Sequence, residues 1–169
     1  ESAIVYNTRL KNFTLIITAL LCVQLVYGAF MSGLKAAMAA ATWPTINGAW
    51  IPDRLMVQSF INHPINVHFM HRQLAYLLFT LIMFWFGNAT KHGKNQPGSL
   101  LNKARIWPFI LVITQVLLGI ITVLSAPRIM LGKFGMYEML AETHQVVAMF
   151  LLMALVVNIY GLRSKRTAA

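Results

Sequence analysis

Acidic side chains and cysteines are scarce in this chain. Aspartate and glutamate together number 4 in 169 residues, and charged residues of both signs make up only 11% of the sequence. A soluble domain usually has about 25% charged residues, so this chain lacks the charge needed to cover a water-exposed surface. Cys22 is the single cysteine, which excludes an intrachain disulfide and says little about the redox compartment.

Apolar residues take the place of the missing charges. They form 58% of the chain, and the mean hydropathy is +0.65. Four apolar stretches each have about the twenty residues that a helix needs to cross the hydrocarbon core. Because a membrane span must satisfy its own backbone, and these stretches are about twice as long as barrel strands, helices are favoured over β-structure. The stretches cover roughly 13–34, 67–86, 106–126 and 139–162.

The sequence therefore predicts an all-α polytopic membrane protein. We expect a single domain over residues 1–169, a four-transmembrane-helix bundle built from two parallel helical hairpins. The alanine-rich run after Lys35 can extend the first helix, because alanine has the highest helix propensity. The helices are expected at about 12–38, 66–87, 105–126 and 138–162, with an outer loop at 39–65.

After the alanine-rich run, the sequence of the outer loop no longer favours a helix. It contains the Asn47-Gly48 turn motif and two tryptophans, Trp43 and Trp50, at positions where indole rings favour the membrane interface. These features predict a loop folded back over the outer surface. An aromatic belt with no other role remains the alternative.

Basic residues are distributed unevenly between the two sides of the predicted bundle. Because lysine and arginine favour the cytoplasmic side, both termini and the middle connection are expected in the cytoplasm or its organellar equivalent. The basic residues on that side are Arg9, Lys11, Lys91, Lys94, Lys103, Arg105, Arg163, Lys165 and Arg166, whereas the other side has Lys35, Arg54, Arg128 and Lys133.

The formal net charge of +10 bears on partners as well as on topology. Basic side chains next to a bilayer can contact anionic headgroups, so membrane lipid is an expected partner. Nucleic acid is not expected as a partner, because no basic patch is interleaved with exposed aromatic residues.

His71 and His144 are expected at one depth in the membrane. His71 lies about five residues after Asn66 and His144 about six after Glu138, which places both roughly 8 Å below the outer boundary. Two imidazoles on separate helices can coordinate a haem iron from two sides, and such ligation favours electron transfer over oxygen binding. A pair of histidines that only hydrogen-bond neighbouring helices remains the alternative.

Neighbouring polar residues leave further alternatives open. His68 shares a helix face with His71 and, with His63 nearby, can form a histidine-rich metal-ion site, although no carboxylate or thiol joins them. Arg72 can pair with a haem propionate through its guanidinium group. It can equally snorkel towards headgroups or pair with an acidic residue, for which the candidates are Glu138 and Glu142.

A weak internal repeat relates the two predicted hairpins. Gln24 and Gly28 in the first helix correspond to Gln115 and Gly119 in the third, and each following helix opens with a histidine and a polar residue. The two glutamines are expected to bond across helices, with contact to a cofactor as the alternative, and the glycines permit close approach. The paired histidine motifs are His71-Arg72 and His144-Gln145.

At these residues the chain resembles the haem A synthase family, specifically its C-terminal four-helix half. The resemblance covers nearly the whole chain, and the order of its motifs is more specific than any one of them. The motifs are Val23-Gln-Leu-Val-Tyr-Gly28, Trp43-Pro44, Asn47-Gly-Ala-Trp-Ile-Pro52, Val67-His-Phe-Met-His-Arg72 and His144-Gln145.

The resemblance implies a bis-histidine haem b held by His71 and His144. Arg72, Gln24 and Gln115 are the further candidate cofactor-binding residues. Family members oxidise the methyl group of haem O to the formyl group of haem A, the form used by cytochrome oxidase. In the family, the substrate haem and a glutamate three residues before its ligand histidine belong to the N-terminal half. Here the corresponding positions are His68 and Ala141, and the outer-loop cysteine pair of many members is missing, so we assign no catalytic residue.

The chain is accordingly expected to be the cofactor-carrying half of an oxidoreductase that needs an N-terminal half or a partner subunit for turnover. A start at Glu1 rather than methionine agrees with a missing N-terminal portion. The resemblance implies an integral protein of the bacterial plasma membrane or the mitochondrial inner membrane. Other implied partners are haem O synthase, cytochrome oxidase and a second copy of the chain.

Two other functional classes remain open. A b-type membrane cytochrome exchanging electrons with quinone would use the same helices and histidines, although ligand pairs at both membrane depths would suit it better. A structural or assembly subunit of a respiratory complex would need no bound iron.

Overall fold

The computed structural model describes residues 4–53, 55, 57–128 and 134–163. Long helices account for most of these residues, and two short strands lie near the ends of the described part. The elements are β1 (Val5–Tyr6), α1 (Thr8–Gly33), α2 (Ala36–Ala39), α3 (Pro64–Lys94), α4 (Leu100–Ala104), α5 (Ile106–Ser125), the 3₁₀ turn η1 (Ala126–Arg128), α6 (Met136–Tyr160) and β2 (Leu162–Arg163).

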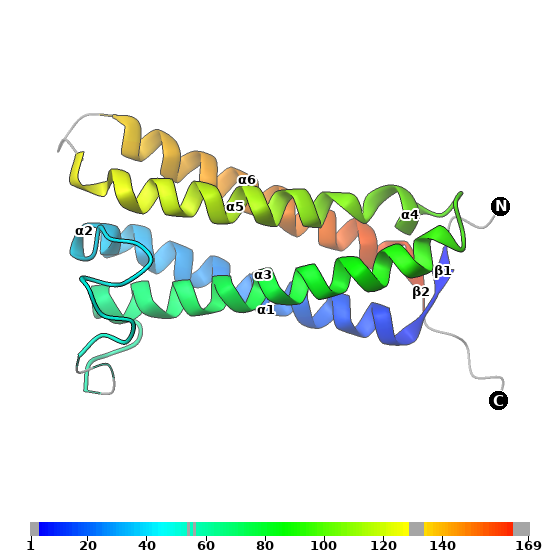
Figure 1. The fold of residues 1–169 in the computed structure, drawn as a ribbon, viewed down its shortest axis with the longest axis horizontal. Coiled ribbons are helices and arrows are strands. Elements are labelled where there is room, and N and C mark those ends of the chain that lie inside the picture. Colours follow the sequence, from blue (N-terminus) through cyan, green and yellow to red (C-terminus); the bar gives the residue numbers. More distant parts are fainter. Residues whose placement is uncertain (1–3, 54, 56, 129–133, 164–169) are drawn as a thin grey trace.

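The prediction of an all-α polytopic membrane protein is confirmed. Four helical segments are long and apolar enough to cross a membrane, and they pack side by side (Figure 1). Helices α1 and α5 run in one direction and α3 and α6 in the other, so the molecule contains two parallel helical hairpins. The four segments are Thr8–Gly33, Pro64–Lys94, Leu100–Arg128 and Met136–Tyr160.

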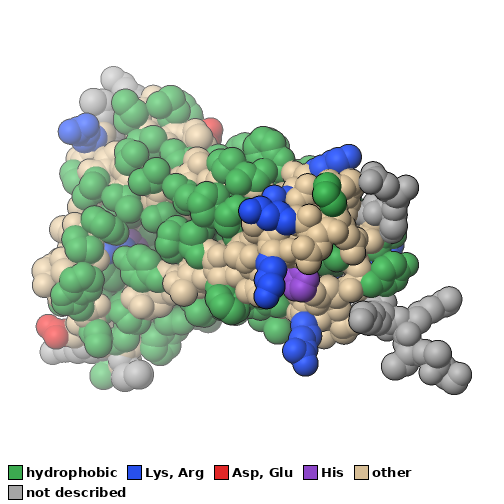
Figure 2. All heavy atoms as spheres, turned by 45° about the vertical axis from the view of Figure 1, so that its right-hand side comes forward, with side chains coloured by type: hydrophobic (Ala, Val, Ile, Leu, Met, Phe, Trp, Pro, Cys, Tyr) green, Lys and Arg blue, Asp and Glu red, His purple; other side chains and the backbone are tan. Residues whose placement is uncertain are grey.

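The two ends of the molecule differ in composition. The first and last described residues, Ile4 and Arg163, and the α3–α4 connection lie at one end, and the long α2–α3 loop, the end of α5 and the start of α6 lie at the other, which we call the loop end (Figure 1). Figure 2 shows Lys and Arg side chains gathered around the first end, with hydrophobic side chains along the helices. We call it the basic end and define it by Arg9, Lys11, Lys91, Lys94, Lys103, Arg105 and Arg163.

Four residues used in the charge argument lie outside the described part of the chain. They are Arg54 and Lys133, predicted on the outer side, and Lys165 and Arg166, predicted on the inner side.

Within each hairpin, the two helices pack more closely with each other than with the helices of the other hairpin. Helix α1 packs mainly against α3, and α5 mainly against α6, while α1–α6 and α3–α5 contacts join the hairpins. The fully buried Trp85 in α3 donates its indole N–H to the Thr14 hydroxyl in α1, at 2.8 Å. This hydrogen bond satisfies a polar group that would otherwise be unpaired between two apolar helices.

The first long helix ends earlier than predicted. It was expected to run to residue 38, but α1 ends at Gly33 and Lys35 has a left-handed backbone with φ of 49°. The alanines that follow form the separate turn α2, in which Ala36 and Ala37 are buried. The helix propensity of alanine favoured a longer first helix. The chain instead turns at Lys35, and the small alanine side chains become buried in the separate turn α2.

The starts of the helices also differ from prediction by a few residues. Helix α1 begins at Thr8 rather than 12, because Asn7 caps it by accepting a hydrogen bond from the Leu10 N–H at 2.9 Å. Helix α3 begins with Pro64, a position where a missing amide donor is harmless. Helix α6 begins at Met136 rather than 138, and α5 begins at Ile106, within one residue of the prediction.

The basic end holds the larger differences. Helix α3 was expected to stop at 87 but continues to Lys94, and basic residues in its last turn favour the helix C-terminus. Helix α6 was expected to run to 162, but Leu162–Arg163 leaves it and pairs in parallel with Val5–Tyr6. This two-residue ladder joins the described segments nearest the two termini.

The outer loop is tied to the first turns of α3. The buried Asn66 side chain donates to the carbonyls of Leu55 and Gln58, at 2.9 and 3.0 Å. The Asn47-Gly48 pair forms the predicted turn, with φ values of 50° and 89°. Trp43 and Trp50 are both exposed, as expected of interfacial tryptophans.

Candidate functional site

The structure brings His71 and His144 together. They lie on α3 and α6, in the half of the molecule nearer the loop end, and their ring centroids are 6.5 Å apart with an interplanar angle of 68°. The two rings come from different hairpins. Their approach therefore depends on how the hairpins pack against each other.

A glycine from the other helix of the same hairpin lies against each ring. A Cβ atom added at Gly28 would lie 3.7 Å from Cε1 of His71, and one added at Gly119 would lie 3.2 Å from Cε1 of His144. The sequence repeat is thus a structural repeat. In both hairpins the absence of a side chain gives an imidazole room to lie against the neighbouring helix.

The two glutamines of the repeat differ in their contacts. Gln24 donates from Nε2 to the backbone carbonyl of His71 at 3.0 Å, and the same nitrogen lies 3.4 Å from Nε2 of that imidazole. Gln24 thus bonds across helices, as predicted. The buried Oε1 atoms of Gln24 and Gln115 make no hydrogen bond within the described part of the chain.

Arg72 directs its donors at the outer loop. It is 8% exposed, its Nε donates to Nε2 of His68 at 3.0 Å, and its Nη2 donates to the carbonyl of Thr42 at 2.5 Å. Its Nη1 donates to the carbonyls of Pro44 and Thr45, at 3.3 and 3.1 Å. The guanidinium group therefore fastens the segment 42–45 to α3, in the turn of helix that contains His71.

Glu138, one of the two acidic residues considered as partners of Arg72, has another role. Glu138 accepts a hydrogen bond from the Gly135 N–H through Oε2 at 2.9 Å, and so it caps the start of α6. A contact between Arg72 and a haem propionate stays a prediction.

The remaining histidines do not form a metal-ion cluster with His71. His68 is fully buried, and its Nε2 accepts a hydrogen bond from Arg72. His92 lies near the basic end, with its Nε2 3.1 Å from the side-chain amide nitrogen of Asn7. Among the described residues, no group of three or more histidine, cysteine or acidic side chains is placed to hold a metal ion. The histidine-rich metal site considered for His63 and His68 therefore finds no support.

The separation of the His71 and His144 rings matches that of two imidazoles that hold one metal from opposite sides. Both Nδ1 atoms are buried and have no hydrogen-bond partner in the described chain. Two imidazole nitrogens at about 2.0–2.1 Å from one metal lie about 4 Å apart, which sets the ring centres about 6 Å apart. The observed separation of 6.5 Å is close to this value. The donor set of two imidazoles also suits haem iron.

Sequence reasoning found the two histidines but missed what surrounds them. The repeated glycines were assigned to helix approach, whereas they also lie under the rings. The carbonyls that bind Arg72 belong to Thr42, Pro44 and Thr45. Because backbone carbonyls occur at every residue, no sequence feature could have identified these three.

Four apolar spans and two neighbouring, half-buried histidines define a polytopic membrane protein with a two-histidine site. The model of the family described as "Cytochrome oxidase assembly protein" matches residues 1–156. The chain belongs to this family, COX15-CtaA.

Relatives named "Heme A synthase" match most of the chain. One from Bartonella quintana is 31% identical over 157 residues, which is 90% of this chain and 40% of that protein. One from Rhodopseudomonas palustris strain TIE-1 is 38% identical over 154 residues, covering 85% of this chain and 37% of the relative. The chain thus spans about two fifths of the length of these relatives. A search of solved structures found no match.

The comparisons support a role in haem A biosynthesis for the family and a haem-related cofactor. With the four spans, they also indicate an integral membrane protein.

Proposed function

We propose that this chain is the haem-binding membrane domain of a haem A synthase, with His71 and His144 as axial ligands of a haem b. The observation that carries the proposal is the separation of 6.5 Å between two half-buried imidazoles from different hairpins, each with its Nδ1 atom buried. In this role the domain supports oxidation of the haem O methyl group to the formyl group of haem A. Iron held by two histidines supplies one-electron transfer.

The protein's own residues hold the two imidazoles in place. Gln24 binds the backbone of α3 at His71 and has its amide nitrogen beside the ring. Gly119 lies so close to His144 that any side chain there would push on the ring. These contacts limit how far either imidazole can turn, so they support a fixed direction for each donor nitrogen.

Turnover of haem O requires more than this chain. The positions three residues before the two proposed ligands hold His68 and Ala141 rather than glutamate. The chain also spans only about two fifths of its relatives. We therefore assign the substrate haem site to an N-terminal half or a partner subunit, and we assign no catalytic base here.

The distribution of charge supports an orientation in the membrane. The basic end, with both termini, is proposed to face the cytoplasm or the mitochondrial matrix, which places the histidine pair nearer the opposite surface. The membrane is the bacterial plasma membrane or the mitochondrial inner membrane. Haem O synthase, cytochrome oxidase and a second copy are further proposed partners.

Absorption spectra of three variants test the ligand assignment. The detergent-purified chain is expected to give a reduced-minus-oxidised spectrum of a low-spin b-type haem. His71→Ala and His144→Ala should each abolish it, whereas the matched control His92→Ala, near the basic end, should leave it unchanged. Pigment that persists in both ligand variants would contradict the assignment.

The extracted pigment separates the remaining functions. Haem b in the extract agrees with the proposal. A parent chain without haem would favour a structural or assembly subunit. Haem O or haem A in the extract would indicate a substrate pocket within this half, and rapid oxidation of a quinol by the chain alone would favour a quinone-linked cytochrome.

A further inference from the structure

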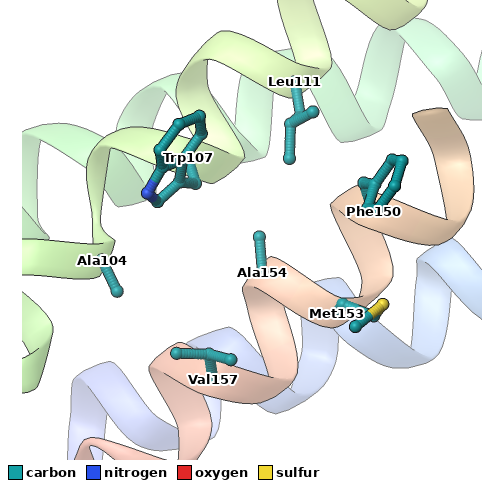
Figure 3. Close-up of a pocket in the computed structure, with 7 residues that line it drawn as sticks. All are labelled: Ala104, Trp107, Leu111, Phe150, Met153, Ala154 and Val157. Atoms are coloured by element: carbon teal, nitrogen blue, oxygen red, sulfur yellow. The ribbon is translucent and has the colours of Figure 1, made fainter.

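An apolar groove lies between α5 and α6, near the basic end and away from the histidine pair. Its volume is about 380 Å³. In Figure 3, Leu111 of α5 and Ala154 of α6 point towards one another across it. The side chains that line the groove are all apolar or aromatic: Ala104, Trp107, Leu111, Phe150, Met153, Ala154 and Val157.

The groove opens onto the outside of the helices. Trp107, Phe150 and Met153 are 55%, 53% and 60% exposed, so the walls project outwards rather than into the core. In a membrane this surface faces hydrocarbon. The small side chains Ala104 and Ala154 leave the space between the walls.

Cationic residues adjoin both walls of the groove in the sequence, on the side of the basic end. Lys103 immediately precedes Ala104, which lines the groove. On the other wall, the Arg163 guanidinium lies 5.3 Å from the centre of the Tyr160 ring, one helical turn beyond Val157. Close contact between Gly161 and Leu101 brings these two segments together.

These cations have no acidic side chain nearby to neutralise them. Three of the acidic residues, Asp53, Glu138 and Glu142, lie at the loop end, and the fourth, Glu1, lies outside the described residues. A partner that binds these cations through charge therefore carries negative charge. Beside a membrane-spanning segment, the headgroup of an anionic lipid supplies it.

We propose that the groove binds one acyl chain of an anionic phospholipid, with its phosphate against Lys103 and Arg163. The wall from Ala104 to Leu111 is about 10 Å long at the helical rise, which suits part of an acyl chain. A spanning helix would need about 30 Å of matching surface. The positive charge at one end and the wholly apolar lining match the two chemically different parts of a phospholipid.

Two adjacent valines provide a matched test. Val157 lines the groove, whereas Val156 does not, and both are exposed, so phenylalanine at either position should leave folding intact. Lipid retention is measured by native mass spectrometry after incubation with phosphatidylglycerol or with phosphatidylcholine of the same chain length. The parent and Val156→Phe should retain phosphatidylglycerol preferentially, and Val157→Phe should lose most of that retention.

Charge variants test the headgroup contact. Lys103→Gln and Arg163→Gln should each reduce the preference for phosphatidylglycerol about fivefold, the factor expected for one cation beside a membrane. Arg9→Gln, on α1, should leave it unchanged, and soluble glycerol phosphate should not compete. Ala154→Phe provides a second variant that fills the groove.

Three results would overturn the proposal: equal retention of the two lipids, unchanged retention in both groove variants, or a dimer that Val157→Phe dissociates. The last would assign the groove to a second copy. The proposal is independent of the haem assignment, because His71→Ala should leave lipid retention unchanged.

Discussion

At the scale of single residues, the repeat places a glycine against each histidine, but the two glycines are not equivalent. An added Cβ at Gly119 would lie 3.2 Å from the His144 ring, closer than ordinary van der Waals contact, whereas the corresponding distance at Gly28 is 3.7 Å. A methyl group should therefore be tolerated at one site and displace the ring at the other.

Gly119→Ala is predicted to disturb the haem site more than Gly28→Ala. Both substitutions gain a similar amount of helix propensity, so a difference between them reports on the ring contact. We expect Gly119→Ala to shift the midpoint potential of the bound haem and lower its retention at least severalfold, with little change for Gly28→Ala. Identical potentials in a redox titration of the two variants would show that neither glycine constrains its histidine.

The hydrogen bond between Trp85 and Thr14 gives a second prediction at this scale. Thr14→Val removes the acceptor of a fully buried indole N–H, and we expect a loss of about 1 kcal/mol in the free energy of unfolding. Thr18→Val is the control, because Thr18 bonds only to the Thr14 carbonyl of its own helix. The free energy of unfolding of both variants is measured in mixed micelles. Equal values for Thr14→Val and Thr18→Val would contradict the prediction.

At the scale of elements, the outer loop is joined to α3 by side-chain hydrogen bonds. Arg72 binds the segment 42–45 and Asn66 binds the carbonyls of Leu55 and Gln58, both from the first turns of the helix that contains His71. The loop is therefore expected to cover the outer side of the histidine pair. Movement of the loop and movement of this turn of α3 should be coupled.

Arg72→Lys is predicted to loosen the loop. A lysine retains the charge but cannot donate in the planar fork that reaches His68 and three carbonyls. Hydrogen exchange of residues 42–49 should become at least severalfold faster, while exchange in α5 should not change. If Arg72 acted only on a haem propionate, the haem potential would shift while loop exchange stayed the same.

The sequence predicted the long elements better than their ends. Runs of about twenty apolar residues are the strongest sequence indication of a span, and all four helices lie where those runs are. The left-handed residue Lys35 and the ladder between Val5–Tyr6 and Leu162–Arg163 depend on tertiary contacts that hydropathy does not describe. The site shows the same difference. The equal depth of His71 and His144 in the sequence predicted that they could lie close together. The contacts of Arg72 with loop carbonyls are tertiary contacts, and no sequence pattern predicted them.

At the scale of the whole molecule, the strongest asymmetry is the distribution of charged side chains between the two ends. Basic side chains gather at one end, and three of the acidic residues, Asp53, Glu138 and Glu142, lie at the other. This distribution supports the proposed orientation in the membrane and gives the proposed lipid groove its polarity. In that orientation, the histidine pair is nearer the membrane surface opposite the cytoplasm or matrix.

The orientation can be tested with single cysteines in a Cys22→Ala background. Lys94→Cys at the basic end and Asp53→Cys in the outer loop are both exposed positions. In intact bacterial cells or spheroplasts, a membrane-impermeant maleimide should label Asp53→Cys only. Labelling of Lys94→Cys before the membrane is opened would reverse the proposed topology.

His71 and His144 are proposed to bind the same metal centre. Pulsed electron paramagnetic resonance of the oxidised protein, prepared with isotope-labelled histidine, detects each histidine nitrogen bound to the iron. We predict couplings to two histidines in the parent and to one in His144→Ala where haem is retained or restored by added pyridine. Coupling to a single histidine in the parent, or two couplings that survive the substitution, would contradict the claim.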